Sequence, residues 1–190
     1  MPDLESLASR DLKPSANLVT AFNRALADQL RRWHASQPGA QADDQRSLKA
    51  LRAAARRSNA AMWVFGDCFR RKPVGALRSR LKDAEKVLGE VRDWDLAIDE
   101  AAEAFEGEDN GLLADWRKQH ERARKKATAW FDQEANALRD DLERFLVETP
   151  LKKGSTFLLG HEAPKLLLRP LKRLREAFNQ LDHDDELPAL

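Results

Sequence analysis

Residues 73–105 read PVGALRSRLKDAEKVLGEVRDWDLAIDEAAEAF, and this stretch decides the fold. If one steps from Leu77 to Phe105 at alternating intervals of four and three residues, every residue reached except Asp95 is apolar. This spacing places them on one face of an α-helix of about thirty residues. Pro73 suits the start of that helix, and Gly107 lies near its end. At about 1.5 Å per residue the helix spans about 50 Å, a length suited to an antiparallel bundle.

The flanking segments show the same periodicity and are separated by short runs rich in glycine and proline. A first helix is predicted over roughly 16–37, capped by Ser15 and ending before Pro38-Gly39, and a second is capped by Asp43 or Asp44 and ends at Gly66. The helix over 73–107 is the third. A fourth runs from near Gly111 to about 148, and apolar residues over 167–181 mark a C-terminal helix. We therefore expect residues 1–190 to form a single all-α domain, an antiparallel helical bundle of about four long helices plus a C-terminal helix.

Composition supports a folded helical protein. Of the 190 residues, 42% are hydrophobic and 34% are charged, which is too many apolar residues for a disordered chain. The single cysteine, Cys68, cannot form an intramolecular disulfide, and we expect an inert thiol. The first thirty residues mix acids with short apolar runs, unlike a signal peptide or a membrane span. These features predict a cytoplasmic protein that does not enter a membrane.

Charge is unevenly distributed along the chain. The net charge is only +1, but residues 46–82 hold eleven bases and one acid, residues 83–110 hold eleven acids and two bases, and residues 150–175 hold seven bases and one acid. Two interpretations stay open. Helices with complementary faces could pair, as in a scaffold or protein-interaction domain, or the basic segments could bind an anion.

The second helix carries a polar stripe beside its apolar face. Lys49, Arg52, Arg56 and Asn59 follow one another at helical spacing, and Arg57 lies just beside them. No acid stands four residues away to pair with these cations within the helix, although they could simply extend into water from a buried face. Guanidinium groups form matched, bidentate bonds with phosphate, so the stripe is also a candidate anion site.

Asp95 occupies a position where the periodicity requires an apolar residue. Burial of an unpaired carboxylate costs several kcal/mol, so we expect a partner from another helix, Arg52 or Arg56. The pair could fix the register of the helices, or Asp95 could orient an arginine toward a ligand.

Signals for catalysis are weak. The four histidines lack metal-ligand spacing, and no phosphate-binding loop or nucleophile motif occurs, so we expect no catalytic residues, no cofactor and no metal. His120 falls in an apolar stripe and is expected to be structural. The enzymatic alternative is magnesium-dependent cleavage of phosphoanhydrides, with Asp95, Asp99 and Glu103 on one helix face holding the metal.

Two motifs in this order resemble the CHAD family, the conserved histidine α-helical domain. The first is KALRAAARRSNAAMWVF over residues 49–65, and the second is LGEVRDWD over residues 88–95. The family's corresponding motifs are His-x-x-Arg-x-x-x-Arg-Arg-x-Arg, ending in an apolar residue and Phe, and Leu-Gly-x-x-Arg-Asp-x-Asp. The sequence departs from the family at two positions, because Lys49 replaces its histidine and Asn59 replaces one of its arginines.

The resemblance implies an all-helical, non-enzymatic protein that binds inorganic polyphosphate in a basic cavity and associates with polyphosphate granules. By position, it implies phosphate contacts for Arg52, Arg56, Arg57 and Arg92, supported by Asp95. We expect the full set of ligand-binding residues to be Lys49, Arg52, Arg56, Arg57, Arg78, Lys82, Arg92, Lys165, Arg169, Lys172 and Arg173, with Asp95 and Asn59 in support. The chain resembles the N-terminal half of a CHAD domain, so we expect either a fragment of a longer protein or a half-unit whose homodimer completes a cavity between two bundles. A nucleic-acid partner is a weaker alternative.

Overall fold

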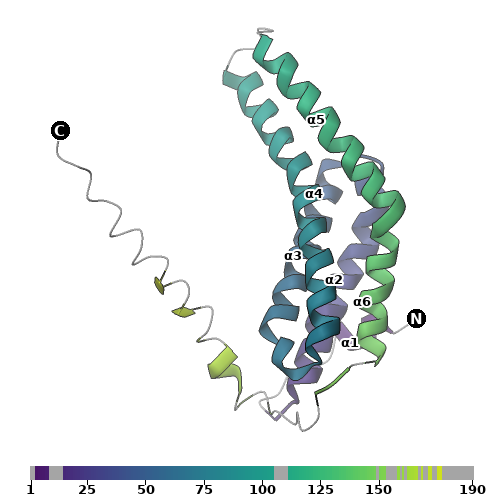
Figure 1. The fold of residues 1–190 in the computed structure, drawn as a ribbon, viewed down its shortest axis with the longest axis vertical. Helices are drawn as coiled ribbons and strands as arrows, with labels where there is room; N and C mark the ends of the chain where they lie inside the picture. The colour runs from purple at the N-terminus through teal and green to yellow at the C-terminus, as the bar shows by residue number, and fades with distance from the viewer. Residues whose placement is uncertain are drawn as a thin grey trace, which may run out of the picture.

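The structure is a computed structural model that describes residues 3–8, 15–104, 111–148 and 150–152, together with separate positions between Leu158 and Glu176. Within these residues the chain is helical and has no β-strand, which confirms the all-α prediction (Figure 1). The elements are α1 (Leu4–Ala8), α2 (Leu18–Gln41), α3 (Gln45–Val64), the short 3-10 helix η1 (Gly66–Cys68), α4 (Arg71–Ala104), α5 (Gly111–Trp130), the π-helical turn η2 (Phe131–Ala135) and α6 (Asn136–Glu148).

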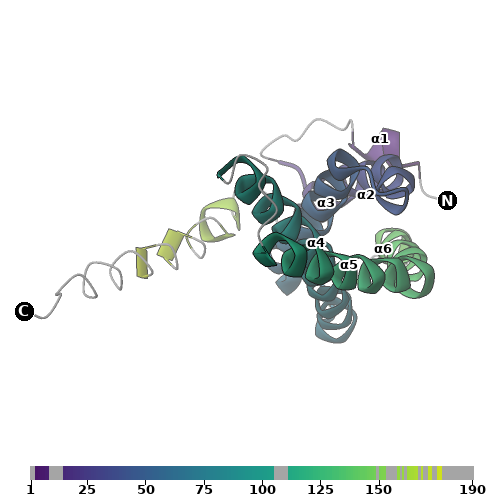
Figure 2. The same ribbon diagram turned by 90° about the horizontal axis from the view of Figure 1, so that it is seen from above.

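Four long rods form the bundle: α2, α3, α4 and the continuous α5–η2–α6 segment. Successive rods are antiparallel neighbours, and α6 returns to contact α2, which closes the bundle (Figures 1 and 2). The far ends of α4 and α5 extend beyond α2 and α3 (Figure 1). The four long helices were predicted, whereas most of the expected C-terminal helix over 167–181 lies outside the described residues.

The turn between α2 and α3 differs from the prediction. Instead of ending before Pro38-Gly39, α2 continues to Gln41. Proline removes only one backbone donor, and the chain then closes the helix with bonds from Asp43 N to Ala40 O and from Asp44 N to Gly39 O. Asp43 adopts the left-handed conformation that this closure requires, with φ 68°. The helix therefore ends after the proline, where hydrogen bonds can satisfy its last carbonyls.

Capping residues set the starts of α2 and α3. Asn17 caps α2, with its side chain accepting from Val19 N, so the predicted cap at Ser15 is wrong. Asp44 caps α3 by accepting from Ser47 N at 2.8 Å, and this confirms one of the two residues proposed for that role. The hydrogen bonds lower the pKa of Asp44 below its usual value.

Apolar faces of all four rods meet in one core. Its largest fully buried side chains include Trp33, Phe22 and Phe69. Near one end of the bundle Phe22, Phe69 and Phe145 pack together, with ring centroids 4.6 to 5.8 Å apart. Phe69 reaches this cluster from the connection after η1, which an isolated bridge to Leu151 holds against the chain beyond α6.

The last rod bends at η2 (Figure 1). A π-helical turn inserts one extra residue into a helix and changes its direction. Directly after this turn, Asn136 accepts a hydrogen bond from Gln37 Nε2, and Gln37 also accepts one from the buried Trp33 Nε1. The bend thus allows one rod to contact α4 along α5 and α2 along α6.

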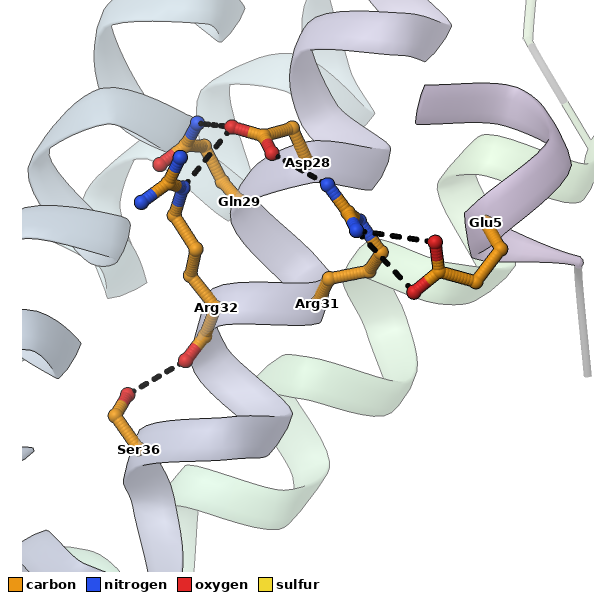
Figure 3. Close-up of polar contacts among 6 residues, drawn as sticks. All are labelled: Glu5, Asp28, Gln29, Arg31, Arg32 and Ser36. Carbon is orange, nitrogen blue, oxygen red and sulfur yellow. Dashed lines mark hydrogen bonds and ion pairs between the residues drawn. The ribbon is translucent and has the colours of Figure 1, made fainter. Parts of the chain in front are cut away.

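An ion-pair cluster fixes α1 onto α2 (Figure 3). Arg31 donates to both carboxylate oxygens of Glu5 on α1 and to Asp28 on its own helix, and Asp28 also accepts from Arg32 and Gln29. Burial tends to raise the pKa of Asp28, but the hydrogen bonds from Arg32 and Arg31 outweigh it and hold the pKa below its usual value. These ion pairs add to the packing of Leu4 and Leu7 of α1 against the core.

Candidate functional site

Helices α3 and α4 together present most of the predicted binding residues on one face. Contacts at three levels fix this antiparallel arrangement: Arg92 to Gln45 at 3.5 Å, Arg52 to Asp93 at 3.9 Å, and Arg78 to Asn59 at 3.2 Å. We call this surface the α3–α4 face. At helical spacing it comprises Gln45, Lys49, Arg52, Arg56 and Asn59 on α3 and Arg78, Lys82, Glu85, Gly89 and Arg92 on α4.

Arg52 crosses from α3 to lie on α4 at Gly89. A Cβ atom added to Gly89 would stand 3.4 Å from Nε and 3.5 Å from the nearer terminal nitrogen of Arg52. The only carboxylate that an ion pair joins to Arg52 within the described chain is Asp93, at 3.9 Å, which is itself 71% exposed. Arg52 is thus positioned by packing, and its charge is only weakly compensated.

At the opposite end of this face Asn59 links two charged residues of α4. Its side chain accepts a hydrogen bond from Arg78 Nε and donates one to Glu85 at 2.9 Å. Asn59, one of the two residues that depart from the family motif, therefore holds Arg78 in place.

Three further cations on the α3–α4 face, Lys49, Arg56 and Lys82, are exposed and contact no carboxylate of the described chain. Some charged groups on other surfaces are paired more closely. Examples are Lys126 with Glu90 at 2.8 Å, Arg144 with Asp141 at 2.9 Å and Arg80 with Glu134 at 3.2 Å. Pairing of complementary helix faces therefore describes the contacts of α4 with α5 and α6, but leaves the α3–α4 face positively charged.

Asp95 is buried, with 7% of its surface exposed, as its position in the periodicity predicted. The predicted partners, Arg52 and Arg56, are wrong. The nearest basic side chain is His120 on α5, with Nε2 2.8 Å from Oδ1, and Arg92 lies 3.9 Å from Oδ2. The reason is geometric, because Asp95 faces the α4–α5 contact and Arg52 lies over the other side of α4.

Burial raises the pKa of the Asp95 carboxyl, and the positive charges of His120 and Arg92 counteract this. Its Oδ2 atom is buried and makes no hydrogen bond within the described residues. Asp95 is therefore a costly buried charge that Arg92 approaches without a direct bond.

The remaining predicted ligands are more dispersed. Arg57 is exposed and lies about 100° around α3 from Arg56. Lys165 pairs with Glu162 at 2.9 Å and lines a hollow with Cys68 beyond the end of α3, away from Arg92. Lys172 lies 3.9 Å from Glu176. Arg169 and Arg173 lie outside the described residues.

A second basic region was missed in the sequence interpretation. Arg70, Lys72, Arg80 and Arg144 line a hollow of about 540 Å³ between the start of α4 and the end of α6, together with Asp141 and Glu148. The run Arg70-Arg71-Lys72 was a signal for it, but the distance in sequence to Arg144 hid the grouping.

Within the described residues, no group of three His, Cys, Asp or Glu side chains is placed to hold a metal ion. The three acids considered for magnesium are separated, because Asp95 is directed inward to His120 while Asp99 and Glu103 are exposed. Burial raises the pKa of the Cys68 thiol, which disfavours a reactive thiolate. None of the helices in the described part of the chain is both long enough and apolar enough to cross a bilayer.

Residues 24–190 match the model of the CHAD domain family, and the chain therefore belongs to this family. The match covers both helices of the α3–α4 face and the partner helix that carries His120. Searches of curated proteins and of solved structures gave no significant match.

Proposed function

We propose that this protein binds inorganic polyphosphate through the α3–α4 face without catalysing a reaction. One observation carries the proposal: five cations of this face, Lys49, Arg52, Arg56, Lys82 and Arg92, have either no carboxylate partner in the described chain or one no closer than 3.9 Å. The CHAD family, which includes this chain, is known for polyphosphate binding.

The arrangement suits a linear polyanion. Lys49, Arg52 and Arg56 follow the axis of α3 at about one turn each, so their charges repeat about every 5 Å along the surface. On α4, Arg78 and Lys82 lie one turn apart, and Arg92 continues the same row about 15 Å further along the helix, beyond Glu85 and Gly89. Such a double row meets successive phosphates of an extended chain, and the guanidinium groups add bidentate hydrogen bonds.

The main alternative is a scaffold that joins proteins through complementary charged faces. Intramolecular pairs such as Lys126 with Glu90 show that this protein uses charge complementarity between its own helices. The α3–α4 face does not follow that pattern, which is why we favour a ligand for it.

Titration with long-chain polyphosphate tests the proposal. We expect the Arg52→Ala, Arg56→Ala double variant to bind at least about tenfold more weakly than wild type at moderate salt, since each lost charged contact is worth about 1 kcal/mol or more. The matched control is Lys118→Ala, Lys125→Ala, which removes the same charge from exposed positions on α5. Equal affinities for wild type and the Arg52/Arg56 variant would contradict the proposal.

Salt dependence and competition define the ligand class. Binding should weaken steeply as salt rises, because a polyanion releases counterions when cations bind it. Displacement of polyphosphate by an equal charge of RNA would favour the nucleic-acid alternative instead. Release of inorganic phosphate from polyphosphate with magnesium, lost in Asp99→Ala, would contradict the non-catalytic part.

We also propose that residues 1–190 behave as one domain and that two copies assemble to enclose the ligand, as the resemblance to half of a CHAD domain implies. Light scattering with and without polyphosphate measures the mass of the assembly. Association with polyphosphate granules follows if binding is tight enough in the cell, and localisation of the Arg52/Arg56 variant tests it.

A further inference from the structure

Asp95 is shared between two basic side chains from different helices. His120 Nε2 on α5 lies 2.8 Å from its Oδ1, and Arg92 on α4 lies 3.9 Å from its Oδ2. Arg92 also reaches the α3–α4 face, where it contacts Gln45 at 3.5 Å. A single buried carboxylate thus connects a histidine on α5 with an arginine of the proposed binding face.

Arg92 is close to Asp95 but not fixed to it. Oδ2 of Asp95 makes no hydrogen bond to any described residue, although it is buried. The exposed fraction of the Arg92 side chain is 19%. A guanidinium in this position can approach the carboxylate or turn outward, and the balance depends on how much positive charge Asp95 already has beside it.

We propose that His120 is a positioning residue for Arg92. Its charge sets how strongly Asp95 attracts Arg92, and therefore how readily Arg92 turns toward bound polyphosphate. Polyphosphate binding thereby depends on pH. This inference rests on the proposed function of the α3–α4 face.

The reason is electrostatic. When the imidazole is neutral, Arg92 is the only full positive charge within 4 Å of Asp95 among the described residues, and the buried carboxylate attracts it strongly. When the imidazole is protonated, Asp95 has a closer cation, so less free energy is needed to turn Arg92 toward a phosphate. Histidine side chains gain their proton between about pH 8 and pH 5, so affinity rises as the pH falls through this range.

Other charged groups surround this cluster. Asp43, at the turn between α2 and α3, adds negative charge that favours the protonated form of Asp95, but Asp43 also forms an ion pair with Arg124 of α5. Glu121, Arg124 and Lys125 lie with His120 along a hollow of about 330 Å³. The charge on the imidazole therefore acts on Asp95 beside an existing ion pair between Asp43 and Arg124.

Polyphosphate affinity is measured by calorimetry at pH 8.5 and 5.5 at constant ionic strength. In wild type we expect affinity to rise on acidification, and in His120→Gln the rise should be about fivefold smaller, at the lower end of couplings between two sites. His34→Gln is the matched control, because His34 pairs with Glu143 between α2 and α6, away from this face. Asp95→Asn should reproduce the His120→Gln profile. A His120→Gln profile that equals wild type overturns the inference.

A second measurement needs no ligand. The side-chain Nε–Hε signal of Arg92, assigned with Arg92→Lys, should move between pH 8.5 and 5.5 in wild type and stay in place in His120→Gln. If wild type binds no polyphosphate at either pH while this signal still moves, the proposed function fails and the coupling remains. If the signal of wild type does not respond, the coupling is refuted whatever the affinity.

Discussion

The guanidinium group of Arg52 on α3 lies against Gly89 of α4, 3.4 Å from the place where a Cβ atom would stand. This contact aligns the two helices and holds Arg52 on the surface that we propose for polyphosphate. A residue larger than alanine at position 89 would displace the Arg52 side chain, so the arginine of the first motif explains why the motif LGEVRDWD has a small residue there.

Substitutions of Gly89 should separate stability from binding. Gly89→Ala places a methyl in ordinary van der Waals contact with Arg52, so binding should persist, and the helix should gain up to about 1 kcal/mol of stability. Gly89→Leu should displace Arg52 and weaken polyphosphate binding about fivefold, equivalent to about 1 kcal/mol. Urea unfolding and calorimetry measure the two effects, and unchanged binding in Gly89→Leu would show that Arg52 is not required there.

Gly39 should tolerate no larger residue. A Cβ atom at this position would stand 2.3 Å from Ser47 Oγ and 2.8 Å from Ser47 Cβ, so α2 and the first turn of α3 would have to separate. We expect Gly39→Ala to destabilise the protein by about 1 to 3 kcal/mol, as overpacking does. Gly75→Ala in α4 is the control, because among the described residues no atom outside its own stretch of helix lies within 4 Å of the added Cβ, and a small gain is expected. Urea unfolding compares the two variants.

Asp28 should contribute to stability above pH 4 and lose this contribution in acid. Hydrogen bonds from Arg32 and Arg31 overcome burial and lower its pKa below 3.8, so the unfolded chain takes up the proton first as the pH falls. Asp28→Asn should cost about 1 kcal/mol at pH 7, since the pairs are partly exposed, and should flatten the acid loss of stability. Unfolding midpoints between pH 2 and 7 measure both effects, and Arg32→Gln should give part of the change.

The carboxyl group of Asp95 should change the stability of the protein with pH in the opposite direction to Asp28. Burial raises its pKa above 3.8, so the folded protein retains the proton that the unfolded chain has already released, and stability falls as the pH rises from 3.8 through the raised pKa. Asp95→Asn should remove this decline. Unfolding free energies of wild type and Asp95→Asn across the same pH series should therefore diverge, and parallel curves would show that the carboxyl is not perturbed by burial.

Local signals in the sequence predicted the helices well, because each long helix repeats its apolar residues every three or four positions and that pattern is independent of the neighbours. The end of α2 was not predictable in this way. Pro38 and Gly39 mark a helix end in isolation, but here the helix continues until Asp43 adopts a left-handed conformation and Asp44 caps the next helix.

The sequence by itself determined the four long helices, the buried position of Asp95 and the grouping of Lys49, Arg52 and Arg56 on one face, since all of these depend on the helical repeat. Only the tertiary structure decided which residues meet across helices. His120 became the partner of Asp95 because α5 packs on the side of α4 to which Asp95 points, and a periodic pattern fixes the direction of a side chain without identifying the helix that lies opposite it.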